Sequence, residues 1–144
     1  MTDYKKVKTL SDIDAAYIAG LIDGEGTITL SKRHSNENRQ VVVSISNNEK
    51  NILDYILDVI GAGSISKKRT YSKHHLINHT YKVSNRQAIS LLAQTNQYLR
   101  SYKRERAEII LDKYLELTPR NGKYTEELFI KRERFIDDFF NIKP

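Results

Sequence analysis

Glu25 is the residue whose type and setting point most directly to chemistry, because its carboxylate stands between Gly24 and Gly26 at the end of an apolar, helix-forming run. The glycines allow backbone conformations that other residues resist, and they end the helix so that the carboxylate is presented at its tip. Two such helices side by side would bring two Glu25 carboxylates together, and carboxylates with backbone carbonyls make a hard-oxygen site suited to Mg²⁺. Gly-Glu-Gly alone is more typical of an ordinary buried helix that ends in an acidic turn.

Other residue types narrow the chemistry. The sequence has no cysteine, which excludes disulfides, thiolate zinc sites and cysteine nucleophiles. His74, His75 and His79 lie close together in the sequence, but their spacing fits no familiar zinc pattern. The charge, in contrast, is informative. The formal net charge is +6, and no acidic residue occurs between Asp58 and Glu105. A long basic stretch without acids favours a polyanionic partner, either nucleic acid or an anionic membrane surface.

The elements that must position these residues follow from periodicity. A helix is expected from Asp12 or Asp14, either of which can cap it, to about Asp23. Alternating apolar and polar residues predict four strands, namely Thr27–His34, Gln40–Ser46, Ser64–Tyr71 and Thr80–Ser84. Further helices are expected from Asn47 or Asn48 to Ile60, and over Asn85–Thr95, Tyr102–Leu117 and Thr125–Phe140.

These elements predict an α+β fold in which two antiparallel hairpins form one four-stranded sheet with helices on one face. The length of 144 residues suits one domain over residues 1–144. No apolar run approaches the roughly 18 residues of a membrane span, and the polar start lacks the apolar core of a secretory signal. An intracellular location and no membrane partner are therefore expected.

The residues from Ile18 to Gly26 read IAGLIDGEG, and this nonapeptide resembles the signature of the LAGLIDADG homing endonucleases. Ser44-Ile45-Ser46-Asn47 before a helix, Ile60-Gly-Ala-Gly63 before a basic strand, and Lys103 at the start of a late helix follow in the family's order. The resemblance covers about Ala15 to Leu117. It implies the LAGLIDADG endonuclease-like fold, with DNA on the sheet face opposite the helices.

The resemblance also implies roles for single residues. Glu25 and the Gly24 carbonyl would bind divalent metal, with Mg²⁺ as the cofactor and Mn²⁺ as a substitute. Lys103 would lie near the scissile phosphate, where it orders water or stabilises developing charge; the alternative is a solvated helix start. Asn47 would position solvent, or else cap a helix. Asp23 would support a pair of helices, or else be a plain helix-end acid.

A chain with one motif should dimerise to cut two strands, so a homodimer is expected. The small residues Ala16, Ala19 and Gly20 let a second helix approach closely, and with Asp23 they form the expected dimer interface. The resemblance implies a site-specific double-strand DNA endonuclease that acts on a long pseudo-palindromic site, has no small-molecule substrate and is usually encoded in an intron or intein. The alternatives are an RNA maturase or DNA-binding regulator of the same fold, and a basic interaction module without nucleic acid.

Outward-pointing strand residues are expected to face DNA, where a twisted antiparallel ribbon fits the major groove. Those expected to face DNA in this way are Thr29, Ser31, Arg33, Gln40, Ser44, Ser66, Lys68, Lys82 and Tyr71. Phosphate contacts are expected from Lys67, Lys73 and Arg86. The three histidines are interpreted as DNA-contacting or merely solvated loop residues.

Overall fold

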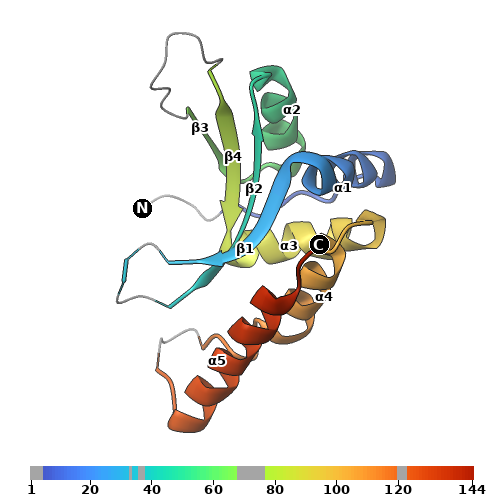
Figure 1. Ribbon diagram of the computed structural model, residues 1–144. Coiled ribbons are helices and arrows are strands. Elements are labelled where there is room, and N and C mark those ends of the chain that lie inside the picture. The colour runs from blue at the N-terminus through green and yellow to red at the C-terminus, as the bar shows by residue number, and fades with distance from the viewer. Residues whose placement is uncertain (1–4, 33, 36–37, 68–76, 120–122) are drawn as a thin grey trace.

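Four antiparallel strands form one sheet in the order β1-β2-β4-β3 (Figure 1). The computed structural model describes residues 5–32, 34–35, 38–67, 77–119 and 123–144. The strands are β1 (Gly26–Ser31), β2 (Gln40–Asn47), β3 (Ser64–Lys67) and β4 (His79–Ser84). Strands β1 and β2 pair as one hairpin and β3 and β4 as the other, and β2 pairs with β4 to join them. The predicted pair of antiparallel hairpins in one sheet is confirmed.

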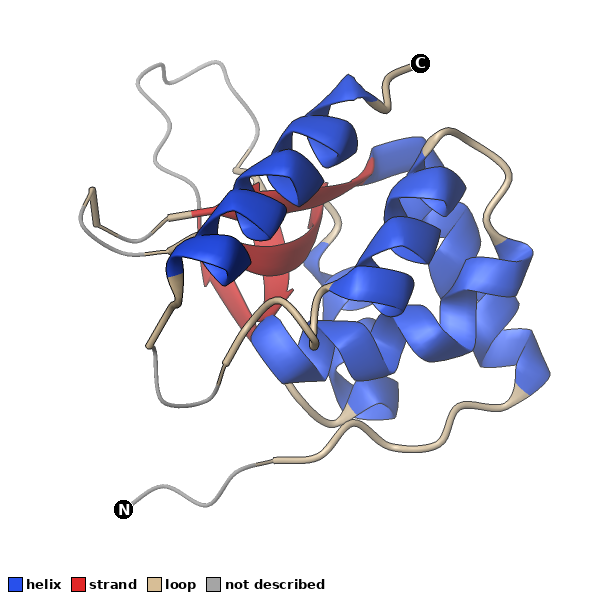
Figure 2. Ribbon diagram, turned by 90° about the horizontal axis from the view of Figure 1, so that it is seen from below, coloured by secondary structure: helices blue, strands red, loops and turns tan. Residues whose placement is uncertain are grey.

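Strand alternation separates the two faces of this sheet. One face carries the residues predicted to point inward, and all of them are buried: Ile28, Leu30, Val41, Val43, Ile45, Tyr81 and Val83. The helices pack on this side, as Figures 1 and 2 show, so the core lies between the sheet and the helical layer. Burial of this apolar face fixes the register, because a slip by one residue would turn every strand over. No helix in the described part of the chain covers the opposite face.

The helical layer contains five α-helices and a short 3₁₀ turn in the described part of the chain. They are α1 (Asp12–Glu25), α2 (Lys50–Ile60), α3 (Asn85–Thr95), η1 (Asn96–Tyr98), α4 (Lys103–Lys113) and α5 (Glu126–Asn141). All predicted helices are present, although α4 ends four residues earlier than expected. None of the described helices is long and apolar enough to cross a membrane.

The ends of α1 differ from the prediction. Ser11, rather than Asp12 or Asp14, caps the helix, since its Oγ accepts a hydrogen bond from the Asp14 N–H at 3.1 Å. Gly24 does not stop the helix but lies within its last turn, and neither Gly24 nor Gly26 has a positive φ. Gly26 is instead required by close packing, because a Cβ there would lie 2.6 Å from Ile22 Cα. Because residue 26 is a glycine, β1 can follow α1 without a loop. Glu25 is therefore the last residue of the helix before the strand begins.

Candidate functional site

Glu25 opens onto a hollow of about 400 Å³ at one edge of the outer sheet face. The last residue of α1 supplies Glu25, the end of β2 supplies Ser46 and Asn47, and the residues Asn48 and Asn78 complete the lining. Every lining residue therefore carries an oxygen that can accept a hydrogen bond or coordinate a hard cation. Ser46, Asn48 and Asn78 were not predicted as site residues, and Asn48 was expected only as a possible start of the next helix. Strand alternation does place Ser46 on the outer face, but no local pattern indicates where Asn78 lies.

Asn47 orients the carboxylate of Glu25. Its Nδ2 donates a hydrogen bond to Glu25 Oε2 at 2.6 Å, and its Oδ1 accepts one from the backbone N–H of Glu49 at 2.8 Å. The second bond fixes which end of the amide faces the carboxylate, because only Oδ1 can accept from an N–H. Asn47 was predicted either to serve the site or to cap the next helix. It contacts Glu25 and also accepts a backbone N–H beside α2, whose N-cap is Glu49.

Lys103 lies behind the end of α1, with a side chain that is only 9% exposed. Its Nζ donates to the carbonyl oxygens of Ile22 and Asp23, each at 2.9 Å. A cation is favourable at this position because the carbonyls at a helix C-terminus carry partial negative charge. Burial lowers the pKa of the Lys103 ammonium, the charge of Asp23 opposes that change, and Arg106 adds to it. The predicted alternative of a solvated helix start is wrong.

Asp23 joins the end of α1 to the segment that leads into α4. Its carboxylate accepts hydrogen bonds from the backbone N–H groups of Arg100 at 2.8 Å and Ser101 at 3.1 Å, and from Ser101 Oγ at 2.6 Å. Partial burial acts to raise the pKa of Asp23. The hydrogen bonds from Ser101 and Arg100, together with the charge of Lys103, outweigh that effect, and the pKa is lowered. Asp23 is thus a structural acceptor within one subunit, next to Lys103.

The donor set around Glu25 suits a hard cation but is incomplete in one subunit. Carboxylate and amide oxygens are ligands for Mg²⁺ or Ca²⁺, and the hollow is open to solvent. However, the part of the chain that the structure describes holds no group of three or more His, Cys, Asp or Glu residues that could bind a metal alone. Further oxygens must come from elsewhere, such as a second subunit or a phosphate. His74 and His75 lie outside the described residues.

The outer face of the sheet is polar along continuous rows that cross the strands. Register places Ser44 between Thr27 and Lys82, and Lys82 opposite Ser64. The next row contains Ser46, Thr80 and Ser66, with Ser46 Oγ and Thr80 Oγ1 2.8 Å apart. Six of the residues predicted to point outward share this face: Thr29, Ser31, Gln40, Ser44, Ser66 and Lys82. Val42 is an apolar residue with the same outward strand parity, and it lies opposite Thr29 on β1 and Ser84 on β4.

The remaining predicted contact residues are placed differently. Arg33, Lys68, Tyr71 and Lys73 lie outside the described residues. Lys67 is exposed at the end of β3, where it pairs with His79, and Arg86 lies half-buried in the first turn of α3. The structure therefore gathers six of the predicted strand residues on the outer face, whereas Lys67 has the strand parity of Ile65 and Arg86 belongs to the helical layer.

The exposed side of α1 carries small residues. Ala16, Gly20 and Gly24 are exposed, and a Cβ added at Gly20 or Gly24 would meet no atom of the same subunit within 4 Å. Ile13 and Tyr17 continue this surface with 82% and 45% of their areas exposed. Ala19, in contrast, is fully buried in the core, so its assignment to a dimer interface is wrong. Ala19 and Gly20 are close on the helical wheel, and the sequence alone did not show which of the two faces the core.

Comparisons with known proteins agree with this geometry. The family model described as LAGLIDADG endonuclease matches residues 18–107. The homing endonuclease I-CvuI, solved in complex with its target in the presence of Ca, matches with a TM-score of 0.72 and 18% identity over 92% of this chain and 83% of its own. The archaeal intron-encoded homing endonuclease I-Vdi141I, complexed with DNA, gives a TM-score of 0.59 and 21% identity over 92% and 86%.

The group I intron-encoded homing endonuclease I-CeuI, also complexed with DNA, gives a TM-score of 0.64 and 17% identity over 92% of this chain and 68% of its own. At these identities the structures share the fold of this chain. A search of curated proteins found no match.

Proposed function

The chain belongs to the LAGLIDADG endonuclease family, and on that premise we propose that it is a site-specific endonuclease that hydrolyses phosphodiester bonds of double-stranded DNA as a homodimer. The observation that carries the proposal is the oriented carboxylate of Glu25. It stands at the end of the motif helix, is held by Asn47, and opens onto the edge of the polar sheet face. This arrangement supports a hydrolytic centre beside a polar strand surface of the kind that can enter a DNA groove.

DNA binding on the outer sheet face is supported by charge and by hydrogen-bonding capacity. The rows of serine, threonine, glutamine and lysine can donate to and accept from base edges in the major groove. Acidic residues are absent from the sequence between Asp58 and Glu105, which includes β3 and β4. The similar structures I-Vdi141I and I-CeuI are complexes with DNA.

We propose that Glu25 and the Gly24 carbonyl hold a divalent metal together with Glu25 of the partner subunit and DNA phosphates. Mg²⁺ fits the hard oxygen donors, and Mn²⁺ should substitute. Structures of I-CvuI were solved in the presence of Ca and of Mg. When bound, such a cation supplies charge that favours deprotonation of water and stabilises the leaving oxygen. Asn47 keeps one oxygen of Glu25 fixed, and Lys103 places a positive charge directly behind the site.

The homodimer follows from the exposed surface of α1. Gly20 and Gly24 leave the backbone bare without a local packing reason, as expected where a second helix approaches closely. A two-fold axis along these helices would bring the two Glu25 residues near each other. The DNA site should accordingly be long and roughly palindromic.

A cleavage assay with matched carboxylate variants tests the proposal. The substrate is a duplex selected by the wild-type protein from a randomised DNA pool, incubated with Mg²⁺ or with excess EDTA. Glu25→Gln should reduce cleavage by several orders of magnitude while specific binding persists, because the variant loses a charged metal ligand. Glu49→Gln, the same change at an exposed carboxylate beyond the hollow, should cut normally. Full cleavage in EDTA would refute a metal mechanism, and tight binding without any cleavage by the wild type would favour a regulator or maturase.

A further inference from the structure

Arg132 of α5 links three separate segments although it is buried. Its side chain is 3% exposed, and its Nη1 donates to the Leu117 carbonyl at 2.9 Å and to Thr118 Oγ1 at 2.5 Å. Its Nη2 donates to the backbone carbonyl of Arg39, which is 93 residues away in the sequence. The rings of Tyr114 and Tyr124 each lie 5.7 Å from the guanidinium carbon. One side chain thus ties α5 to the segment after α4 and to the start of β2.

Arg39, the residue held by Arg132, is fixed from a second direction. Its own Nη1 donates to the Leu30 carbonyl of β1 at 3.0 Å, and its guanidinium lies 5.2 Å from the ring centre of Phe140 on α5. The next residue along the chain, Gln40, pairs in register with Ser31. Both side chains belong to the outer face, so the contacts of Arg39 determine where this end of the β1–β2 pair lies.

A second arginine, Arg106, links the C-terminal end of α5 to β1. Arg106 donates from Nη1 to the Ile28 carbonyl and from Nε to the Ile142 carbonyl, each at 3.0 Å. Its guanidinium also lies 4.7 Å from the ring centre of Phe139. Helix α5 is therefore attached to the β1–β2 pair at its middle, through Arg132, and at its C-terminal end, and it lies beside this end of the sheet in Figures 1 and 2.

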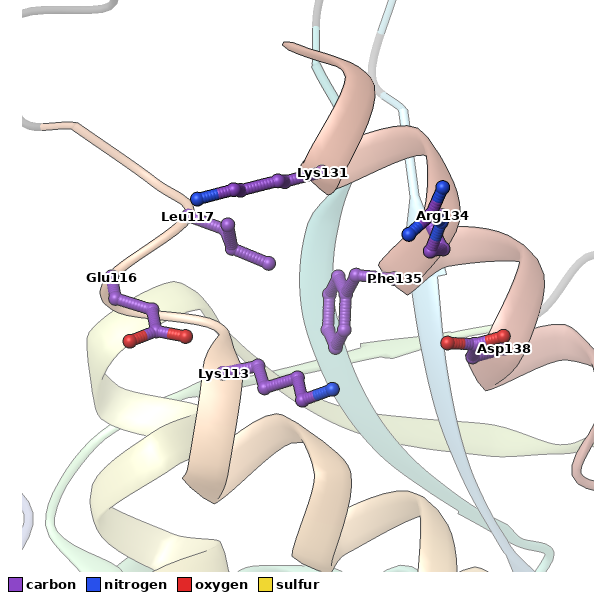
Figure 3. A pocket seen from close by; sticks show the side chains of 7 residues that line it. All are labelled: Lys113, Glu116, Leu117, Lys131, Arg134, Phe135 and Asp138. Carbon is purple, nitrogen blue, oxygen red and sulfur yellow. The ribbon is translucent and has the colours of Figure 1, made fainter. Parts of the chain in front are cut away.

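The hydrogen bonds of Arg132 and Arg106 position α5, in addition to the packing of its apolar side chains. A hollow of about 320 Å³ separates α5 from the end of α4, and Figure 3 shows Phe135 and Leu117 lining it together with charged side chains from both helices. Phe135 and Phe139 pack α5 into the core, but the apolar packing between α5 and the end of α4 is interrupted at this hollow. Burying a guanidinium is costly compared with burying an apolar side chain of similar size, but its fork of donors can bind several carbonyls at once in fixed directions. The arrangement is that of a positional clamp.

We propose that α5 is a brace that sets the position of Ser31 and Gln40 on the DNA, with Arg132 as a positioning residue for base recognition. The brace lies beyond residues 18–107, the segment matched by the family model. The proposal rests on the proposed function, since it assigns a role in reading DNA. It requires that the far side of the sheet, where Ser66 and Lys82 lie on β3 and β4, reads its bases independently of α5.

The test is a base-by-base binding profile. The wild-type protein selects a site from a randomised duplex pool, and its binding is measured to that site and to every single-base-pair substitution. Gln40→Ala and Ser31→Ala identify the base pairs read beside α5, and Lys82→Ala identifies those read by the other hairpin. Arg132→Met keeps a long side chain but removes the donors. It should lower discrimination by roughly 5- to 10-fold at the first set of base pairs, the lower end of the range of a base contact, and leave the second set unchanged.

Matched variants separate positioning from general destabilisation. Arg134→Met makes the same change two residues along α5 at an exposed position, and it should keep the wild-type profile. If Arg132→Met fails to fold, Phe140→Leu weakens the contact of Arg39 while the Arg132 clamp remains, and it should relax the same base pairs. An unchanged Arg132→Met profile, a profile flattened equally at all positions, or the absence of base pairs that depend on Ser31 or Gln40 would overturn the brace. A wild type that selects no sequence would contradict the proposed function itself and the brace with it.

Discussion

Asn47 shows how a single neutral side chain can control a carboxylate. The backbone N–H of Glu49 fixes its amide, and the amide in turn holds one oxygen of Glu25 at 2.6 Å. Glu25 also lines the hollow, and its Oε1 is not the atom that Asn47 holds. An amide suits this position better than an acid, because a second carboxylate at hydrogen-bond distance would repel the carboxylate of Glu25.

Asn47→Ala should lower the cleavage rate by about 10- to 100-fold, the usual effect of losing a group that orients a metal ligand. The carboxylate remains, so cleavage should not disappear as it does in Glu25→Gln. Single-turnover cleavage of the selected duplex at several Mg²⁺ concentrations measures the effect, and a higher Mg²⁺ requirement is expected. Asn51→Ala, on the exposed side of α2, is the matched control. Equal rates for Asn47→Ala and the wild type would remove Asn47 from the site.

Among the elements, the junction between α1 and α4 depends on pairs of residues that are distant in sequence. Asp23 and Ser101 are 78 residues apart, and Lys103 reaches back to the carbonyl of Ile22 across 81 residues. Lys103 is buried there without a salt bridge to Glu25, and it orders the end of the helix that presents Glu25. Lys103 and Glu25 are thereby connected through the last turn of α1.

Asp23→Ala should lower the free energy of unfolding by roughly 1–2 kcal/mol at pH 7, because three donors lose their acceptor. The pKa of Asp23 is lowered in the folded state, so its contribution is present above its ordinary value of 3.8 and is lost as the pH falls through the folded-state value. The difference in unfolding free energy between wild type and variant should therefore begin to narrow as the pH falls below 3.8. Urea titrations from pH 7 to pH 3 test this, and a constant difference would contradict the assignment. Asp112→Ala, an exposed acid on α4, should show little effect at any pH.

Sequence periodicity predicted the elements well because local residues decide them. Alternation in β1, β2 and β4 reports burial on one face, and every residue predicted to point inward is buried. It could not predict that α1 continues through Gly24, since helix termination depends on the close contact of Gly26 with Ile22. It also could not place Ala19 in the core, reveal the partners of Asp23 or connect Arg132 with Arg39. Such contacts arise from packing between elements, which leaves no pattern in neighbouring residues.

The small-residue surface of α1 gives a prediction about assembly. Gly20→Leu should leave the subunit folded, because the new side chain meets no atom of its own subunit near its Cβ. It should separate the dimer, because a leucine keeps two helices from close approach. Sedimentation at several protein concentrations measures the mass, and circular dichroism verifies folding. Ala93→Leu adds a large side chain to an exposed position of α3 and should keep the dimer. A wild type that sediments as a monomer, both free and on DNA, would rule out the homodimer.

At the scale of the whole molecule, chemistry and recognition occupy different places. The helices cover one face of the sheet and the outer face stays polar, with Glu25 at the edge where α1 passes into β1 (Figure 1). In the proposed function, the net charge of +6 would attract the protein to DNA, whereas the rows of side chains across the strands would supply the direct base contacts. Mutations should therefore separate the general electrostatic affinity for DNA from the discrimination between base sequences.

Lys82→Ala and Lys113→Ala provide that separation, because both remove one positive charge from an exposed position. Lys82 stands in the row with Ser44 on the outer face, and Lys113 ends α4 in the helical layer. Lys82→Ala should weaken binding to the selected site by about 1–3 kcal/mol if it reads a base edge, with smaller loss on unrelated duplexes. Lys113→Ala should change neither binding constant, since the proposed DNA-binding face is the outer face of the sheet and Lys113 lies in the helical layer. Binding measured between 50 and 200 mM salt, a range chosen because phosphate contacts weaken steeply across it, completes the comparison. Equal losses from the two variants would mean that net charge alone draws the protein to DNA and that the sheet face does not read it.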